Sequence, residues 1–464
     1  MNRNQILRLL YIVAFIVSSI LRLGLALANR EAFDDHIVVV NIILQTHKLP
    51  ETADCPECFQ PKLFYYVAST AIRFAHINLN HEDSIIIATQ LLNFIAGEMI
   101  LILAYLLIKR MQVDHHEAGL ITFALLAFNP ALIAANGMAS NDTFAILFST
   151  LAIYFCWIFL SKNKIGYLFI SGFFVVMGIA TKTNIWATVL AIFLALLLKS
   201  VKEKSFLGTL IAAAFLLGVS IVTLLNPLSQ YLANLQNYGT PVTLNVVKEP
   251  FPAFFEKTYV RRPGILSIQD GIFTFKFIDL LEYPRLTFGA TDYPAHRTSL
   301  WTDVYASANS LHFYNSPDSW HTKPDFQVSR SIFVLALLPA ALLLFGVVSG
   351  WINLLKGIFG TSNNMLTSRS YGLFDIVFIG YIIFIVVLAL QYRDFSTMKA
   401  IYIYPAILSF SVLFLEALIV FDNSVLKRSK WITILFEVVI VLLIGLYVTD
   451  IFQMIVHLYN LNIR

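Results

Sequence analysis

Long apolar runs alternate along this chain with short polar stretches that carry most of its charges. A helix needs about 20 apolar residues to cross the hydrocarbon core of a bilayer, and its backbone satisfies its own hydrogen bonds there. The pattern predicts an all-α polytopic membrane protein with about eleven transmembrane helices. The expected spans are 5–27, 84–108, 117–135, 142–161, 165–181, 183–198, 206–226, 331–355, 372–392, 398–421 and 431–456.

A further apolar stretch, 61–77, is shorter and is interrupted by Lys62 and Arg73. Basic residues decide how it lies, because short loops rich in Lys and Arg face the cytoplasm. If 61–77 does not cross, all the basic groups fall on one side; if it crosses, the N-terminal group falls opposite the others. We therefore predict a juxtamembrane helix on the extracytoplasmic side, a cytoplasmic N-terminus and an extracytoplasmic C-terminus. The groups are Arg3/Arg8, Lys109/Arg110, Lys162/Lys164, Lys199/Lys202/Lys204, Lys356/Arg369 and Lys427/Arg428/Lys430.

The composition supports a membrane protein. Of 464 residues, 58% are hydrophobic and 13% are charged, with a mean hydropathy of +0.74. Soluble domains are about 45–50% apolar and about 25% charged, so this chain has too few charges to cover a soluble surface. The net charge of +4 is small and scattered, which argues against a nucleic-acid partner. We therefore expect an integral, multi-pass membrane protein.

Two long segments lie outside the expected spans, 28–83 and 227–330, and both fall on the extracytoplasmic side. The second is rich in Pro, Tyr, Arg and His. A structureless loop of that length would be unusual, so we expect it to fold as a cap. The expected domains are an N-terminal transmembrane module over 1–226, the cap over 227–330, and C-terminal transmembrane helices over 331–464.

Acidic and basic residues collect at the extracytoplasmic ends of the expected spans. One such residue often only snorkels into the headgroup region, but acids and bases from four segments on one face indicate a site. A transporter would instead bury charge near the midplane, where only scattered residues, Glu98, Asp375, Glu416 and Glu437, are found. The residues on the outer face are Asp34, Asp35, His36, Asn141, Asp142, Lys182, Arg393, Asp394 and Lys399.

These residue types suit sugar transfer at a membrane surface. A carboxylate can take a proton from an acceptor hydroxyl or amine while it attacks an activated sugar. Lys and Arg can hold a phosphate leaving group. The aromatic residues of 293–320 offer flat faces for a sugar or a polyprenyl tail, and an interfacial aromatic belt explains them equally well. Within the cap we expect Arg285, His296, Arg297 and Trp301 near the substrate.

The chain has three cysteines, two of them in a C-P-E-C pair, Cys55 and Cys58, on the outer face. A disulfide that staples the loop is the leading interpretation, because that compartment is oxidising. The alternative is a zinc site with His47 or His36, although one C-x-x-C pair supplies only half of the usual ligands. A redox motif is disfavoured, since no thioredoxin-like pattern surrounds the pair. Cys156 lies in mid-span and is expected to pack in the core.

Four short stretches carry a family resemblance. They are F-D-D-H at 33–36, Q-P-K-L-F-Y-Y at 60–66, an N-P … N-D pattern within 129–142, and G-I-A-T-K-T at 178–183, with a weaker likeness at 399–405. Their order and spacing resemble the GT-C glycosyltransferases, specifically the bacterial branch related to protein O-mannosyltransferases and to the lipid A aminoarabinose transferase. The likeness covers residues 1–200 well and 390–420 loosely. Gln60 and Lys62 replace a histidine and a proline of the family pattern, and Lys399 stands where arginine is common.

The resemblance implies an inverting transfer of a sugar from a polyprenyl-phosphate-linked donor on the extracytoplasmic face. It assigns the general base to Asp34, with Asp35 as the close second. The acceptor stays open among a glycan, a lipid and a protein. The residues expected at the substrate are His36, Gln60, Lys62, Tyr65, Tyr66, Asp142, Lys182, Arg297, Trp301, Arg393, Lys399 and Tyr402.

The same resemblance bears on cofactors. Some GT-C enzymes, notably the oligosaccharyltransferases, hold a divalent ion with acidic motifs from these two loops. Asp34 and Asp142 would be the ligands here, and oxygen-rich ligation suits Mg or Mn. The O-mannosyltransferase-like branch generally does without a catalytic metal, so we expect no cofactor.

Two other functions compete with the transferase. A lipid-linked-sugar flippase or transporter would need functional charge at mid-membrane and a path open to both faces. A ligase or polymerase of surface polysaccharide is chemically close to the transferase and differs in using a polyprenyl diphosphate-linked glycan.

Overall fold

The protein is described from a computed structural model over residues 2–32, 35–112, 115–242, 268–284, 299–311, 326–359, 372–392 and 398–463, and every regular element in these ranges is a helix. Within them, nine helices are long and apolar enough to cross a membrane, and a bent pair makes up to ten. The prediction of an all-α integral membrane protein is confirmed. The count of eleven stays a prediction, because it also needs the shorter apolar helix Ile165–Ile179 to cross.

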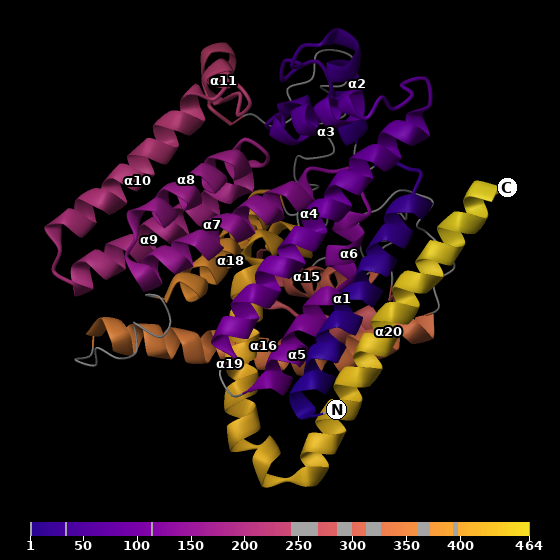
Figure 1. Ribbon diagram of the computed structural model, residues 1–464, viewed down its shortest axis with the longest axis vertical. Coiled ribbons are helices and arrows are strands. Elements are labelled where there is room, and N and C mark those ends of the chain that lie inside the picture. Colours follow the sequence, from indigo (N-terminus) through magenta and orange to yellow (C-terminus); the bar gives the residue numbers. More distant parts are fainter. Residues whose placement is uncertain are drawn as a thin grey trace.

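The nine long helices form an inclined bundle (Figure 1). Helix α7 lies at its centre, since 89% of its most apolar window is buried, compared with 22% for α10 and α20. The central position of α7 matters for function, because its first residue is Asp142. The long helices are α1 (Arg3–Ala28), α4 (Glu82–Met111), α7 (Asp142–Lys162), α9 (Trp186–Lys202), α10 (Phe206–Leu225), α16 (Phe326–Phe359), α18 (Leu373–Tyr392), α19 (Ile407–Ser424) and α20 (Lys430–Ile463).

Shorter elements connect and cover the bundle. Of these, α8 pairs with α7 as an antiparallel hairpin, since Ser171 donates to the carbonyl of Ala152 at 2.8 Å. They are α2 (His36–Thr46), η1 (Pro56–Phe59), α3 (Leu63–Phe74), α5 (His116–Ala127), α6 (Pro130–Asn136), α8 (Ile165–Ile179), η2 (Thr183–Ile185), α11 (Tyr231–Tyr238), α13 (Ile268–Phe273), α14 (Phe277–Glu282), α15 (Leu300–Asn309), η8 (Ala400–Tyr402), η9 (Tyr404–Ala406) and η10 (Leu426–Arg428).

Helix α3 does not cross the bundle. Helices α1 and α4 are antiparallel, because Tyr11 near the start of α1 donates to Gln112 just beyond α4, at 3.0 Å. The end of α1 and the start of α4 therefore lie at the same end, and α2 and α3 lie between them (Figure 1). Arg73 fastens α3 to α2 by donating to the carbonyls of Ile43 and Leu44 at 2.6 and 2.9 Å. The expected juxtamembrane helix is thus present at what we call the α2–α3 end.

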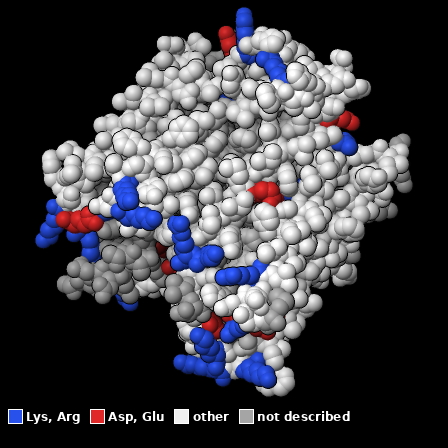
Figure 2. All heavy atoms as spheres, viewed as in Figure 1, with Lys and Arg blue, Asp and Glu red and all other residues white. Residues whose placement is uncertain are grey.

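The opposite end of the bundle gathers the basic groups. Arg3 of α1 pairs with Glu117 of α5, and Lys202 of α9 donates to Gly357 of α16 at 2.5 Å. Arg110 at the end of α4 lies over the Trp157 ring of α7. The described members of the six predicted groups accordingly share one end, and Figure 2 shows basic side chains there below a broad band with few charges. Arg369 lies outside the described residues.

The predicted span 117–135 is broken into α5 and α6, which meet at 49°. Pro130 begins α6, and Asn129 caps it by accepting from the amide of Leu132 at 2.9 Å. The buried guanidinium of Arg22 donates to the carbonyl of Ala127 at the end of α5, at 2.7 Å. The side chains of Asn129 and Arg22 thus satisfy backbone groups that the break leaves without helical partners, and the break leads the chain into the start of α7.

Candidate functional site

A buried ion pair marks the α2–α3 end of the bundle. The ammonium of Lys182, in the turn between α8 and α9, lies 2.5 Å from Oδ1 of Asp142 at the start of α7. Both residues are less than a tenth exposed. Ser140 donates to the other carboxylate oxygen at 3.3 Å, and the ammonium stands 5.4 Å from the centre of the Tyr402 ring. Three residues predicted for the site, from three distant segments, therefore meet here.

Backbone hydrogen bonds fasten the start of α3 to this pair. The amide of Leu63 donates to Ala180 at 2.9 Å, and the amide of Lys62 donates to Leu228 at 2.7 Å. Asn141 donates through its side chain to the carbonyl of Thr181 at 3.0 Å, one residue before Lys182. The stretches at 60–66, 129–142 and 178–183 are thus parts of one structure.

Lys62 is fully buried, and its ammonium donates to the carbonyl of Cys58. Burial lowers the pKa of Lys62 to about 7, although the carboxylates of Glu57 and Asp54 act in the opposite direction. At neutral pH the side chain therefore exists in both protonation states. A buried lysine whose pKa is lowered in this way can gain a full charge when an anion arrives.

The expected disulfide between Cys55 and Cys58 is confirmed. It closes the 3₁₀ turn η1, whose Cys58 carbonyl accepts from Lys62. The bridge leaves neither thiolate available as a ligand, so the zinc alternative is wrong. Cys156 is buried in α7, as predicted.

The acidic stretch at 33–36 leads into α2. Asp35 is exposed, has a φ of 54°, and precedes the first helical residue, His36. His36 is buried, and its Nδ1 lies 2.6 Å from the hydroxyl of Tyr65 on α3. The accessible carboxylate of Asp35 thus stands on a rigid support. Asp34, the preferred base, lies outside the described residues.

An aromatic contact joins α3 to the ion pair. Phe64 packs edge-on against Phe144, two residues after Asp142, with ring centres 5.2 Å apart. The remaining predicted residues of this stretch differ in exposure, since Gln60 is half-buried and Tyr66 is exposed.

The late segment at 399–405 closes the site from the other side. Lys399 is buried, and the next amide, of Ala400, donates to Ser307 of α15 at 2.9 Å. The hydroxyl of Tyr404 donates to Asn129 at 2.8 Å, and Asn129 donates in turn to Ala308 at 3.0 Å. The N-P motif therefore joins the late segment to the cap helix α15.

Not every predicted residue is brought to the ion pair. The indole of Trp301 donates to the carbonyl of Ile272 at 2.6 Å, so its polar atom serves packing between α15 and α13. A role of Trp301 at the substrate stays a prediction. Arg285, His296, Arg297 and Arg393 lie outside the described residues.

Sequence reasoning missed a polar wall on α4. Gln90 and Asn93 are fully buried, and Asn93 donates to the carbonyls of Met138 and Ser140 at 2.6 and 2.8 Å. Within the described residues, both polar atoms of the Gln90 side chain and Oδ1 of Asn93 lack a partner. Buried polar atoms are expensive when unsatisfied, so these point to a hydroxyl-bearing ligand or water. Two amides within one apolar run were the signal in the sequence.

The expectation of no metal stays a prediction, because Asp34, one of the two possible ligands, lies outside the described residues. No group of three His, Cys, Asp or Glu side chains has metal-binding geometry within the described ranges. Asp142 already faces the ammonium of Lys182, which opposes a second cation at the same carboxylate.

Part of the chain matches a known protein family. Residues 61–225, from the start of α3 to the end of α10, match the family described as dolichyl-phosphate-mannose-protein mannosyltransferase. This stretch includes Lys62, Asp142 and Lys182. No curated protein matches the chain.

Solved structures resemble the whole chain. The Archaeoglobus fulgidus oligosaccharyltransferase, crystallised with Zn and sulfate, aligns with a TM-score of 0.52 at 16% identity, over 95% of this chain and 53% of that one. ArnT from Cupriavidus metallidurans, bound to undecaprenyl phosphate, aligns with a TM-score of 0.39 at 15% identity, over 89% and 77%. The chain thus spans about half the length of the oligosaccharyltransferase. The family match covers residues 61–225 alone, and the alignment with the oligosaccharyltransferase shows that the two chains share a fold.

Proposed function

We propose that this protein transfers a sugar from a polyprenyl-phosphate-linked donor to an acceptor on the extracytoplasmic face of a bacterial inner membrane, with inversion at the sugar carbon. The observation that carries the proposal is the buried Asp142–Lys182 pair. It lies within the stretch that matches a lipid-phosphate-sugar transferase family, at the same end of the bundle as Asp35.

The chemistry needs a base for the acceptor and a cation for the leaving group. The carboxylate of Asp34 or Asp35 takes the acceptor proton while the acceptor atom attacks the sugar carbon. The bond from that carbon to the phosphate oxygen breaks, and polyprenyl phosphate leaves with the electron pair. Negative charge then grows on the phosphate, where Lys182 stabilises it.

Asp142 has a positioning role in this scheme. Its carboxylate holds the ammonium of Lys182 at 2.5 Å and fixes where the cation stands before the donor arrives. Lys399 and Lys62, both buried at the same site, add cationic character as the phosphate enters. Positive groups in a poorly hydrated site act more strongly on a developing charge than they would in water.

The polar wall on α4 supplies the sugar contacts. Gln90 presents an amide donor and acceptor that lack protein partners among the described residues, and Asn93 presents an acceptor. Sugar hydroxyls both donate and accept hydrogen bonds, so they match this wall. The Tyr402 ring beside Lys182 offers a flat face to the donor.

Two observations support the extracytoplasmic placement of the α2–α3 end. The basic groups lie at the opposite end, as the positive-inside rule requires of the cytoplasmic face. The Cys55–Cys58 disulfide lies at the α2–α3 end, and disulfides persist in oxidising compartments.

A donor screen tests the proposal. Reconstituted protein would be offered several polyprenyl-phosphate sugars and nucleotide sugars together with crude membrane acceptors, and free polyprenyl phosphate would be followed by mass spectrometry. We expect release from one lipid-linked donor and a loss of about 10²–10⁴-fold in the Asp34→Asn/Asp35→Asn variant. Asp83→Asn is the matched control, because Asp83 is an exposed acid in the first turn of α4 at the same end.

Two outcomes would contradict the proposal. Absence of release from every lipid-linked donor would favour the flippase or transporter. Full activity in the double variant would remove both acids as the base.

A further inference from the structure

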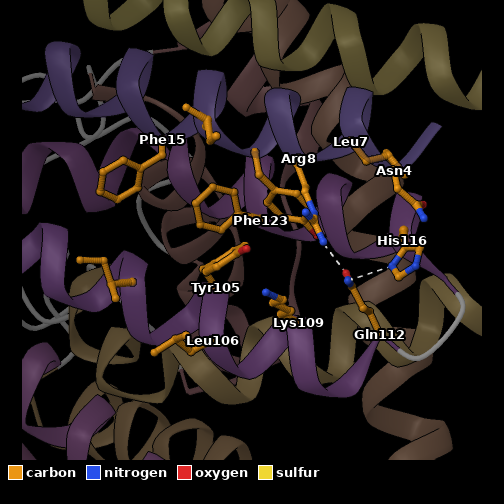
Figure 3. A pocket seen from close by; sticks show the side chains of 13 residues that line it. Asn4, Leu7, Arg8, Phe15, Tyr105, Leu106, Lys109, Gln112, His116 and Phe123 are labelled. Carbon is orange, nitrogen blue, oxygen red and sulfur yellow. Dashed lines mark hydrogen bonds between the residues drawn. The ribbon is translucent and has the colours of Figure 1, made fainter. Parts of the chain in front are cut away.

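A cavity lies at the end of the bundle opposite the ion pair, between α1, α4 and the start of α5. It has a volume of about 850 Å³ (Figure 3). Asn93 and Lys109 stand on the same helix, and a rise of about 1.5 Å per residue puts the cavity about 24 Å along α4 from the polar wall. The cavity is therefore separate from the proposed active site. Its lining residues are Asn4, Leu7, Arg8, Tyr11, Ile12, Phe15, Ile102, Tyr105, Leu106, Lys109, Gln112, His116 and Phe123.

The wall of this cavity is apolar and open to the bilayer. The rings of Tyr11, Tyr105 and Phe123 pack together with centres 5.3 to 5.9 Å apart. Ile12 and Ile102 are about half exposed, at 54% and 47%, although they belong to membrane-crossing helices. Such a wall suits a hydrocarbon chain.

Three polar side chains of the wall form hydrogen bonds with one another. Tyr11 donates to Gln112 at 3.0 Å, and the amide nitrogen of Gln112 lies 3.1 Å from Nδ1 of His116. In Figure 3 Gln112 and His116 lie toward one end of the cavity and Phe15 lies toward the other. A ligand in the cavity therefore does not have to supply hydrogen bonds to these three side chains.

Two cations stand at the rim. Arg8 and Lys109 are exposed, and Lys109 lies 5.7 Å from the centre of the Tyr105 ring. Among the described residues neither forms an ion pair, and Glu117 in the first turn of α5 is already engaged by Arg3. The lining includes no acidic side chain. Among the described residues, the cations of the rim thus have no acidic partner, and they stand beside an apolar wall.

We propose that this groove binds an anionic glycerophospholipid of the membrane. Its phosphate would lie between Arg8 and Lys109, and one acyl chain would follow the aromatic wall. Basic pockets between transmembrane helices select anionic headgroups, and the volume is in the range of sites for ligands of this size. The proposal depends on the membrane location of the chain and is independent of the sugar transfer proposed above.

Native mass spectrometry of the full chain in a neutral detergent tests it. Phosphatidylglycerol, phosphatidylcholine and a polyprenyl phosphate would each be titrated, and the fraction of protein with one bound lipid would be measured. We expect phosphatidylglycerol to bind most tightly. Arg8→Ala and Lys109→Ala should each weaken it roughly fivefold, and the double variant about 25-fold.

Two further variants separate the groove from general charge and general folding. Lys162→Ala/Lys164→Ala removes two exposed lysines from the same end, outside the groove, and should leave binding unchanged. Ile102→Trp keeps the rim charges and fills the wall, and should weaken binding. Equal binding of phosphatidylcholine, tighter binding of polyprenyl phosphate, or equal losses in the Lys162/Lys164 control would each overturn the proposal.

Discussion

The two ends of the bundle treat ionisable side chains in opposite ways. At the α2–α3 end, Asp142, Lys182 and Lys62 are buried, and each is held by a partner. At the other end, Arg8 and Lys109 are exposed around an apolar groove and form no ion pair among the described residues. Burying a charge costs several kcal/mol, whereas exposing one costs almost nothing. The buried charges therefore need a functional reason. For the exposed pair, we propose that an anionic lipid supplies the missing negative charge.

We expect the largest loss of stability when the ion pair is disrupted. Lys182→Met leaves the Asp142 carboxylate buried without its cation, and we expect it to lower the free energy of unfolding by about 3–5 kcal/mol. Asp142→Asn should act in the same direction. Denaturant unfolding in detergent micelles measures both.

The double variant Asp142→Asn/Lys182→Met is the control for this prediction. It removes both charges, so its loss of unfolding free energy should be smaller than the sum of the two single losses. Simple additivity would show that the two groups do not interact in solution.

The next largest effect is expected at Lys62, because its burial makes the free energy of unfolding depend on pH. Its pKa is about 7 when folded and near its ordinary 10.5 when unfolded. Between these values the unfolded chain binds more protons, so the free energy of unfolding should rise with pH by about 1.4 kcal/mol per pH unit, and below pH 7 this contribution is flat. Lys62→Met should remove the rise between pH 7 and 9.

Lys48→Met is the matched control for Lys62, since Lys48 is an exposed lysine of the same loop. It should keep the slope of the wild-type protein. If Lys62→Met keeps the wild-type slope, water reaches the ammonium of Lys62 and burial does not lower its pKa.

Gly97 tests how closely α4 must approach the broken span. A Cβ at Gly97 would fall 2.1 Å from the side-chain nitrogen of the buried Asn136 at the end of α6. Gly97→Ala should therefore cost about 1–3 kcal/mol of unfolding free energy. Gly218→Ala in α10 meets open space and should gain about 0.5–1 kcal/mol. Equal effects at the two glycines would show that α6 moves freely.

The positions of the helices and the placement of α3 could be predicted from the sequence. Helix positions follow from apolar length, so each of the eleven expected spans contains a helix or, at 117–135, a bent pair, although α19 begins nine residues into the span expected at 398–421. The parity of basic groups placed α3 outside the bundle because charge distribution acts on whole loops.

The polar wall and the break escaped that reasoning for a physical reason. Gln90 and Asn93 lie inside an apolar run, where averaging over about 20 residues hides them. Arg22 only interrupts its run in the sequence, yet in three dimensions it closes the end of α5. Which face of a helix a polar residue occupies depends on neighbours that are remote in sequence.

The smallest expected effect belongs to the rim of the groove. Without lipid, Arg8→Ala/Lys109→Ala should change the free energy of unfolding by no more than about 0.5 kcal/mol, because exposed side chains without partners stabilise little. Adding phosphatidylglycerol should raise the melting temperature of the wild-type protein and leave that of the variant almost unchanged, since a ligand stabilises only the form that binds it. A large loss of stability without lipid would mean that the two cations hold α1 and α4 together by themselves. Charged side chains would then stabilise the fold at both ends of the bundle, although they are buried at one end and exposed at the other.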